Sequence, residues 1–267
     1  MIKNILTIAG SDSGGGAGIQ ADLKTIAALG EYGLSVITAV TAQNTKEVAG
    51  VHPIPPDIIA AQLKAVFEDI RIDAVKIGML ACPQSITEIA AALQRYKPQH
   101  IVLDPVMIST SGDRLCSDET IAALKEYLVP LATIITPNLP EARVLLGPPY
   151  DGDVNGFAAA LMEELDVKSV LLKGGHADGA EAVDIFIDGA ATTALSQPRI
   201  ETKNTHGTGC TLASALAVYL AQGLAPLEAA RAAKAYVTGA LQHAHELDVG
   251  HGAGPLNHFY KRGAGDE

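Results

Sequence analysis

One stretch of this chain, residues 74–105, reads AVKIGMLACPQSITEIAAALQRYKPQHIVLDP. Its two ends, 74–77 and 101–103, are short runs of mainly apolar residues, which is the pattern of strands covered on both faces. The middle, 83–96, has the pattern of an amphipathic helix. A strand, a helix and a second strand in succession predict neighbouring parallel strands in a sheet wrapped by helices.

The same alternation continues in both directions along the chain. It predicts further strands at 5–9, 35–42, 133–136 and 170–172, and further helices at 18–29, 55–70, 118–128 and 158–165. After Lys173 the runs 182–187 and 191–195 flank Asp188-Gly189, a strong hairpin turn signal. Two long helices follow, from about Thr208 and about Pro226. We predict a single α/β domain over residues 1–267, with a mainly parallel central sheet, helices on both faces and an antiparallel edge hairpin.

Composition excludes some partners. Lys and Arg total 19 against 30 Asp and Glu, a net charge of -11, which gives no basic face for nucleic acid. No apolar run reaches the length of a membrane span, and the apolar stretch at the N-terminus is too short for a signal peptide. The three cysteines form no C-x-x-C pair, which favours a reducing compartment. We therefore expect a cytoplasmic protein that binds neither nucleic acid nor membrane.

Ligands of open α/β sheets bind beyond the carboxyl ends of the strands. The residues predicted to lie there are Gly10-Ser11-Asp12, Gln43-Asn44, Gly78-Met79, Asp104-Pro105, Pro137-Asn138 with Glu141, and the run Lys173-Gly174-Gly175-His176. The glycine-rich segment 10–18 does not fit the dinucleotide fingerprint, so it is either a loop that closes over a small molecule or a plain connection. His176, His206 and His251 stand singly and match no zinc spacing.

The run Gly207-Thr208-Gly209-Cys210 opens a helix, where backbone N–H groups and the helix dipole favour an anion. An ordinary capped loop is the alternative, and no Walker-A sequence is present. Cys210 is either an inert buried side chain or, at a helix N-terminus, a thiol whose pKa falls from about 8.5 toward neutrality. In the second case it could accept a proton from an attacking hydroxyl.

Three acidic or amide residues could hold a metal ion at this edge. Asp104 follows a strand, and Asn138 and Glu141 open the next helix on one side of its first turn. Such groups hold magnesium together with substrate phosphates; the alternative is a helix cap formed by Asn138 and Glu141. Lys173 is either a solvated charge or, as its glycine neighbours favour, a group that neutralises phosphate charge.

Several segments in this order resemble the ribokinase superfamily and, within it, the hydroxymethylpyrimidine and phosphomethylpyrimidine kinases of thiamine biosynthesis. The resemblance covers nearly the whole chain. The matching segments are GGAGIQADLK at 15–24, TAQNT at 41–45, KIGML at 76–80, DPVM at 104–107, TPNLPEA at 136–142, KGGH at 173–176, KNTHGTGCT at 203–211 and a Gly-His-Gly-x-Gly-Pro tail at 250–255.

The resemblance implies a kinase that uses ATP and Mg2+ to phosphorylate a pyrimidine alcohol and then its monophosphate. It implies that Gly207, Thr208 and Gly209 hold the transferred phosphoryl group and that Cys210 replaces the aspartate base of most of the superfamily. It also implies that Lys173 and Asn138 contact the nucleotide, Asp104 and Glu141 organise magnesium, and Gln43 reads the aminopyrimidine. Asp22, Gly10 and Met79 complete that pocket, and a homodimer is expected. The alternatives are a pyridoxal or pyridoxine kinase and a catalytically silent pyrimidine-binding regulator.

Overall fold

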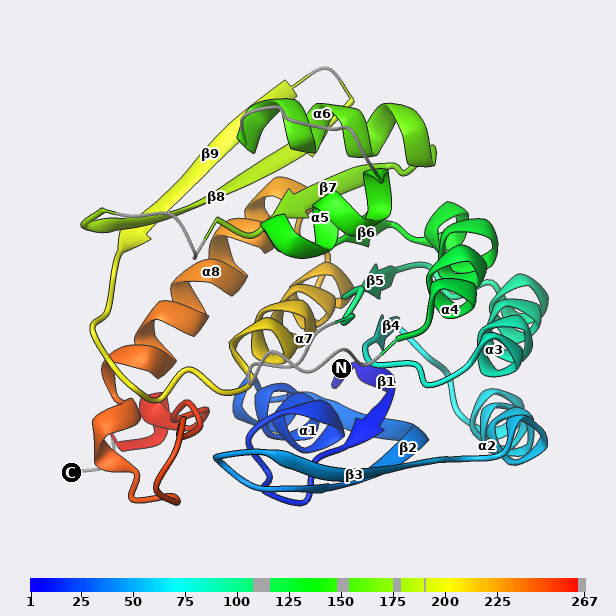
Figure 1. Ribbon diagram of the computed structural model, residues 1–267, viewed down its shortest axis with the longest axis horizontal. Coiled ribbons are helices and arrows are strands. Elements are labelled where there is room, and N and C mark those ends of the chain that lie inside the picture. The colour runs from blue at the N-terminus through cyan, green and yellow to red at the C-terminus, as the bar shows by residue number, and fades with distance from the viewer. Residues whose placement is uncertain (108–115, 148–153, 175–178, 190, 264–267) are drawn as a thin grey trace.

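Nine strands form one sheet in the order β3-β2-β1-β4-β5-β6-β7-β8-β9, from the bottom to the top of Figure 1. The computed structural model describes residues 1–107, 116–147, 154–174, 179–189 and 191–263. The strands are β1 (Asn4–Ser11), β2 (Tyr32–Gln43), β3 (Val48–Pro53), β4 (Ala74–Ile77), β5 (Ile101–Leu103), β6 (Ile134–Ile135), β7 (Ser169–Leu172), β8 (Glu181–Asp188) and β9 (Ala191–Pro198).

The pairing of the strands confirms the predicted fold class. The six inner strands, β2, β1, β4, β5, β6 and β7, are parallel to one another. β8 pairs antiparallel with β7 and with β9, so the hairpin predicted around Asp188-Gly189 is present, with Gly189 in the left-handed region at φ +56°. The sequence did not predict β3, which pairs antiparallel with β2 at the other edge. Nearly all of its residues are exposed, so β3 carries no hydrophobic pattern.

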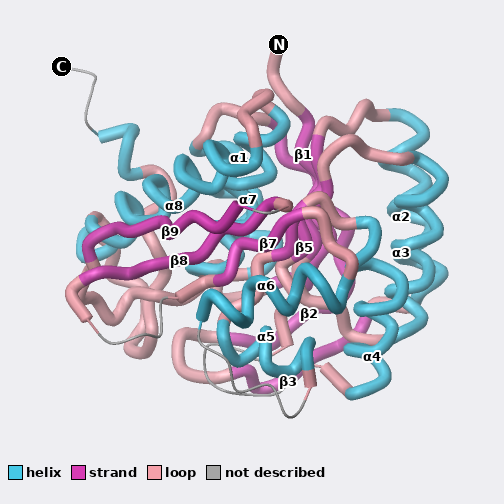
Figure 2. Tube along the Cα trace, turned by 90° about the horizontal axis from the view of Figure 1, so that it is seen from above, coloured by secondary structure: helices cyan, strands magenta, loops and turns pink. Residues whose placement is uncertain are grey.

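Helices cover both faces of the sheet, as predicted (Figures 1 and 2). The clusters of buried side chains show that α2 to α6 pack on one face, and α7 and α8 on the other, where α1 packs against α7. The helices are α1 (Gly18–Ala28), α2 (Pro56–Asp69), α3 (Pro83–Tyr96), α4 (Asp118–Ala123), α5 (Leu139–Leu146), α6 (Val154–Leu165), α7 (Thr208–Ala221) and α8 (Pro226–Gln242). Among the described helices, none combines the length and the apolar character needed to cross a bilayer.

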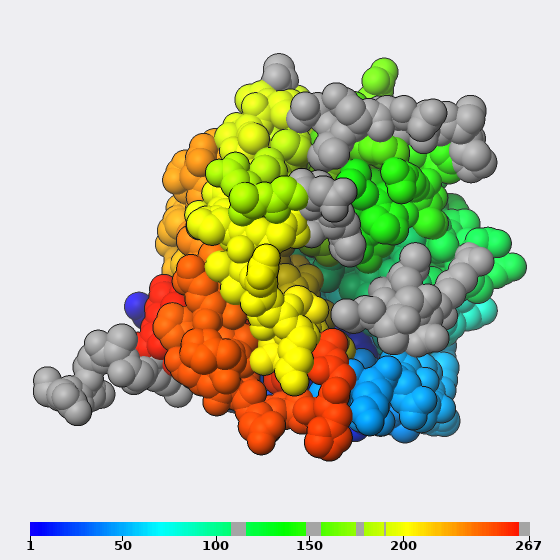
Figure 3. All heavy atoms as spheres, turned by 60° about the vertical axis from the view of Figure 1, so that its left-hand side comes forward, coloured from blue at the N-terminus to red at the C-terminus, as the bar shows by residue number. Residues whose placement is uncertain are grey.

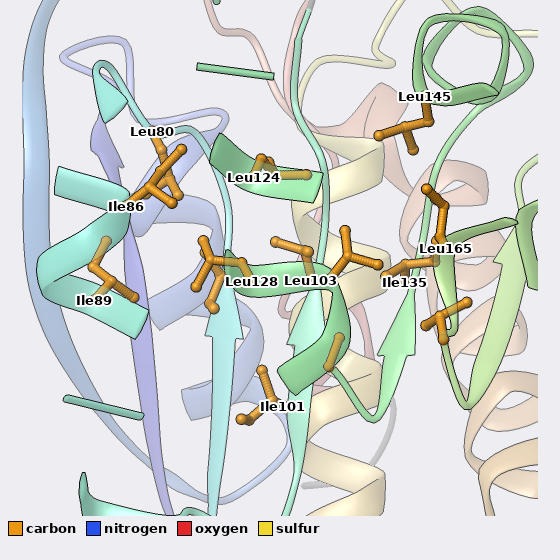
Figure 4. Packing of buried hydrophobic residues seen from close by; sticks show 14 of the residues in the cluster. Leu80, Ile86, Ile89, Ile101, Leu103, Leu124, Leu128, Ile135, Leu145 and Leu165 are labelled. Carbon is orange, nitrogen blue, oxygen red and sulfur yellow. The ribbon is translucent and has the colours of Figure 1, made fainter. Parts of the chain in front are cut away.

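Alternate residues of the buried strands point to opposite faces. In β4, Val75 and Ile77 join the core beneath α2 to α6, whereas Ala74 faces the core beneath α7 and α8. Figure 4 shows the first of these cores, in which Ile86 and Ile89 of α3 and Leu103 of β5 lie in one packed layer. This double coverage explains the continuous apolar runs from which the strands were predicted.

One predicted helix is wrong in detail. The segment 118–128 is an α-helix only to Ala123, continues as a π-helical turn over Leu124–Leu128 and ends in a 3-10 turn over Val129–Leu131. Leu124, Leu128 and Val129 are all buried, so packing against the core determines this irregular path. Helical periodicity alone does not distinguish an α-turn from a π-turn.

Candidate active site

The carboxyl ends of the inner strands meet the start of α7 at one edge of the sheet (Figure 1). From β1 the chain moves outward to β2 on one side, and it later returns to place β4 on the other side of β1. Such a reversal of strand order opens a crevice beyond the strand ends. The predicted site residues therefore lie at the place where the topology favours a ligand.

The start of α7 presents backbone N–H groups to this edge. Gly207 is the residue before α7 and has φ +84°, a conformation that favours glycine. A side chain at Gly207 would also collide with the carbonyl oxygen of Gly16, so the loop 12–17 packs directly on it. No side chain of the described residues caps α7, and its first turn holds no acidic residue. Its positive dipole end thus remains available to an anion.

A cluster of charged side chains lies beside this helix start. Lys173 Nζ donates to Asp104 Oδ1 at 2.8 Å and lies 3.7 Å from Glu141 Oε2. The hydroxyl of Thr136 also donates to Asp104 Oδ1, at 3.0 Å. A Cβ atom added at Gly209 would lie 3.3 Å from Lys173 Nζ and 3.5 Å from Asp104 Oδ2. The ammonium group, the carboxylates and the helix N-terminus therefore surround one small volume.

Asn138 and Glu141 form a capping box at the start of α5. The Asn138 N–H donates to Glu141 Oε2 and the Glu141 N–H donates to Asn138 Oδ1, each at 2.8 Å. The cap that the sequence left as an alternative is therefore present, and it coexists with the contact between Glu141 and Lys173. A bridge between Asn138 and Lys173 joins the two segments side by side.

Burial and charge perturb this cluster. Burial raises the pKa of Glu141, and the neighbouring Asp104 raises it further, while Lys173 opposes both. Burial alone would lower the pKa of Lys173, but the carboxylates of Asp104 and Glu141 outweigh it and raise that pKa. Lys173 therefore stays a cation, held between two acidic groups.

The residues present fit a magnesium ion that is bound together with phosphate. Among the described residues, no three His, Cys, Asp or Glu side chains converge in a way that could hold a metal. Asp104 and Glu141 instead supply two carboxylates beside the same ammonium group. Magnesium is commonly held by one or two carboxylates, with substrate phosphates and water completing its shell.

Cys210 lies in the first turn of α7 and is partly buried. The expectation that its pKa falls toward neutrality is wrong for this structure. Burial raises the pKa of the thiol to about 11, and the carboxylates of Asp22 and Asp104 raise it further, although Lys76 and the Gly18 N–H lower it. Desolvation therefore outweighs the helix dipole, on which the sequence argument depended.

Asp22, predicted for the pyrimidine pocket, lies beneath the site. Both of its carboxylate oxygens lie 2.9 Å from Lys76 Nζ, and the hydroxyls of Thr7 and Ser214 donate to it at 2.6 and 2.7 Å. Asp22 and Lys76 are both 0% exposed. A residue without exposed surface contacts no ligand in this arrangement, so Asp22 supports the layer beneath Cys210.

Gln43 lies at the end of β2, on a separate pocket wall. A cavity of about 330 Å³ is lined by Gln43, Asn44, Thr45, Lys46, Glu47, His206, Gly252 and Ala253. The Gln43 amide nitrogen lies 3.4 Å from His206 Nε2, and the same ring nitrogen lies 2.9 Å from Asp12 Oδ2. Gly10 of β1 lies against Met79, which follows β4 by two residues, because a Cβ at Gly10 would be 2.9 Å from the Met79 methyl carbon.

Comparison with known proteins identifies the family. Residues 12–257 match the family model described as phosphomethylpyrimidine kinase. The chain belongs to the phosphomethylpyrimidine kinase family. The resemblance drawn from the sequence motifs is therefore confirmed over nearly the whole chain.

Relatives of this family member include a hydroxymethylpyrimidine/phosphomethylpyrimidine kinase of Rhizobium meliloti, 50% identical over 258 residues that cover 96% of this chain and 97% of the relative. A thiamine biosynthesis bifunctional protein of Geobacter sulfurreducens is 52% identical over 96% of this chain, which spans about half (52%) of that longer relative. Among solved structures, the pyridoxal kinase of Staphylococcus aureus in complex with AMP-PCP and pyridoxal has a TM-score of 0.88 and 33% identity, covering 98% of this chain and 95% of that one.

Sequence reasoning missed two buried polar pairs in this phosphomethylpyrimidine kinase. Lys76 was visible as a lysine inside a four-residue strand, and a buried lysine requires an acidic partner. Asp12 accepts hydrogen bonds from the N–H groups of Gly14, Gly16 and Ala17 and so shapes the glycine-rich loop. Its partner His206 is 194 residues away in the chain, a distance at which no local pattern reveals a contact. Of the predicted run 173–176, Gly175 and His176 lie outside the described residues.

Proposed function

We propose that this chain is an ATP-dependent kinase that phosphorylates 4-amino-5-hydroxymethyl-2-methylpyrimidine and then its monophosphate. One observation carries the proposal: Gly209, in the first turn of α7, lies directly against Lys173 and Asp104. An ammonium group and helix N–H donors around one volume are what a transferring phosphoryl group requires. The names of the family and its relatives supply the acceptor, and the AMP-PCP complex of the related kinase supports ATP as donor.

In this proposal, the acceptor oxygen attacks the γ-phosphorus of ATP while the bond from phosphorus to the bridging oxygen breaks. ADP leaves with the bonding electron pair. The N–H groups of Gly207, Gly209 and Cys210 hold the equatorial oxygens, beside Thr208, whose own N–H donates to the Thr205 carbonyl oxygen at 3.3 Å. Lys173 neutralises the charge of the equatorial oxygens. Magnesium, bound through Asp104 and Glu141, would add charge neutralisation at the phosphates. Asn138, which caps the start of α5 next to Glu141, would contact the nucleotide.

Cys210 contributes less to proton transfer than a thiol that is already ionised at pH 7 would contribute. A thiol whose pKa is about 11 is protonated at pH 7. In a loose transition state the acceptor oxygen loses its proton late, so little early deprotonation is needed. We therefore propose that the small thiolate fraction of Cys210 accepts the proton of the acceptor hydroxyl. Positioning and charge neutralisation provide most of the acceleration.

Gln43 is proposed as the reader of the aminopyrimidine. Its amide offers donors and an acceptor side by side, which matches an exocyclic amine next to a ring nitrogen. It lines a cavity together with His206. Gly10 and Met79 would contact the rest of the substrate.

The deciding experiment offers the chain Mg-ATP with each of three acceptors: hydroxymethylpyrimidine, its monophosphate and pyridoxal. Mass analysis should find the monophosphate and the diphosphate of the pyrimidine, with pyridoxal phosphate formed less efficiently. Formation of pyridoxal phosphate alone would make the chain a pyridoxal kinase, and no product from any acceptor would make it a silent binder. A single catalytic domain, a cytoplasmic location and a homodimer stay predictions for this chain.

A further inference from the structure

The glycine-rich tail segment, residues 250–255, packs on the turn that follows β2. The Gly252 N–H donates to Thr45 Oγ1 at 3.0 Å, and the Ala253 N–H donates to the Thr45 carbonyl oxygen at 2.9 Å. Thr45 lies only two residues after Gln43. Figure 3 shows the atoms of this part of the chain, in orange, adjoining those of the β2–β3 hairpin, in blue. The end of the chain thereby fixes the turn next to the proposed pyrimidine reader.

The other end of the tail segment holds the loop that leads into α7. The His206 N–H donates to the Gly254 carbonyl oxygen at 3.0 Å, and His206 and Pro255 form a parallel bridge. Gly254 also packs against Asn204, whose side-chain amide donates to the Ala244 carbonyl oxygen at 2.7 Å. The tail segment therefore connects the Thr45 turn with the residue directly before Gly207.

These contacts require glycine. A Cβ atom at Gly252 would collide with the carbonyl oxygen of Thr45, although Gly252 itself does not have a positive φ. Gly250 has φ +70° and packs on the Thr45 side chain. Since Gly252 needs no unusual backbone angle, its close approach to Thr45 is the reason that glycine stands there.

The contacts of the tail segment enclose the cavity of about 330 Å³ next to Gln43. Its lining comes from the turn after β2, from His206 and from Gly252 and Ala253 of the tail segment. Gln43 and His206, the two residues that the tail segment holds in place from either end, have ring and amide nitrogens 3.4 Å apart. The tail segment thus forms one wall of the cavity. It also contacts the other two walls, the turn after β2 and His206.

We propose that the tail segment is a positioning element for the acceptor: through Thr45 and His206 it sets the distance between Gln43 and the start of α7. The acceptor lies between the two, because it contacts Gln43 and attacks the phosphoryl group held at the start of α7. Apart from that phosphoryl group, the proposed nucleotide contacts at Lys173, Asn138, Asp104 and Glu141 make no contact with the tail segment among the described residues. A displaced tail segment should therefore weaken use of the pyrimidine and spare use of ATP. This inference rests on the proposed function.

The test compares Gly252→Ala with Gly50→Ala, a matched substitution in the β2–β3 hairpin on which Gly252 packs, where a Cβ atom would meet only Ala42 Cβ at 3.9 Å. Displacements of about 1 Å can cost on the order of 100-fold in rate. We expect Gly252→Ala to raise the KM for hydroxymethylpyrimidine at least about tenfold, with the KM for ATP within about twofold of the unaltered enzyme. Gly50→Ala should leave both values unchanged.

A second pair of variants covers the case in which Gly252→Ala does not fold. Thr45→Val removes the oxygen that accepts from Gly252, and Thr45→Ser keeps it. The pyrimidine KM should rise more in Thr45→Val than in Thr45→Ser. Equal KM values in Gly252→Ala and Gly50→Ala, or in the two Thr45 variants, would overturn the inference, as would a parallel rise in the KM for ATP. If the unaltered enzyme does not phosphorylate the pyrimidine, the proposed function fails instead.

Discussion

Replacing Cys210 with alanine separates two roles of this residue: the thiol as proton acceptor and the backbone N–H as a donor to the phosphoryl group. Cys210→Ala removes the sulfur atom and keeps the backbone N–H at the start of α7. Burial raises the pKa of the thiol to about 11. At pH 7, four units lower, only about one thiol in 10,000 is ionised. Since an acid loses its proton as the pH rises, the thiolate fraction grows about tenfold per pH unit up to about pH 10.

The quantity to measure is the ratio of kcat for the unaltered enzyme to kcat for Cys210→Ala, from pH 7 to pH 10, because the ratio cancels ionisations shared by both enzymes. At pH 7 we expect a ratio of roughly 10, below the usual range of about 100 to 10,000 for a general base, because a loose transition state demands little of the base. The ratio should then rise with pH. The KM for ATP should not change, since the N–H donors remain.

Product formation is followed by mass analysis at saturating Mg-ATP and pyrimidine, which avoids coupling enzymes with pH dependences of their own. Cys210→Asp is the matched control: a carboxylate is already ionised at neutral pH, so its activity relative to alanine should be flat over this range. A ratio of one at every pH would make the thiol a bystander, and Cys210 would act only through its backbone. A ratio that stays constant above one from pH 7 to pH 10 would show instead that the neutral thiol is the active form, because with a pKa of about 11 the neutral fraction hardly changes over this range.

Four other single substitutions test the remaining parts of the site and the ion pair beneath it. Gln43→Met should lower the ratio of pyrimidine to pyridoxal specificity constants by roughly 5- to 150-fold, since an unpaired polar contact costs about 1–3 kcal/mol; an unmoved ratio would contradict its reading role. Glu141→Gln and Asp104→Asn should each raise the magnesium concentration needed for half-maximal rate without unfolding the chain, which a magnesium titration with circular dichroism checks. Lys76→Met leaves Asp22 buried and unpaired, so thermal unfolding should show a loss of about 3–5 kcal/mol, partly restored in the double variant with Asp22→Asn; an unchanged Tm would refute this.

Much of the fold was predictable because each inner strand is buried on both faces. Residues 74–77 and 101–103 therefore read as apolar runs, and the helices between them follow a 3.6-residue period. β3 was not predictable in this way, since its exposed residues carry no pattern and it is held by its pairing with β2. The π-helical turn over Leu124–Leu128 depends on packing in the same way.

The candidate site was predictable where chemistry and position coincide in the sequence. Asp104 and Lys173 directly follow predicted strands and Asn138 comes two residues after another, so topology alone brings them to one edge. The pairs Lys76 with Asp22 and His206 with Asp12 join residues 54 and 194 positions apart. Such contacts depend on the three-dimensional arrangement of α1, β4 and α7, which local patterns do not specify.

The surroundings of Cys210 give a physical reason for a thiol at this position. The carboxylates of Asp22 and Asp104 both act on Cys210 and disfavour a negative charge there. The nearby cation of Lys76 is already balanced by Asp22, with which it forms a buried ion pair. An aspartate at position 210, the base that the resemblance assigns to most of the superfamily, would add a third carboxylate to this region. Burial and the Asp104 carboxylate disfavour its charge, while the Lys76 cation offsets the repulsion from Asp22. A thiol is neutral at pH 7 and avoids that repulsion, at the cost of a small ionised fraction. The same argument limits Cys210→Asp, which we expect to recover only part of the activity lost in Cys210→Ala.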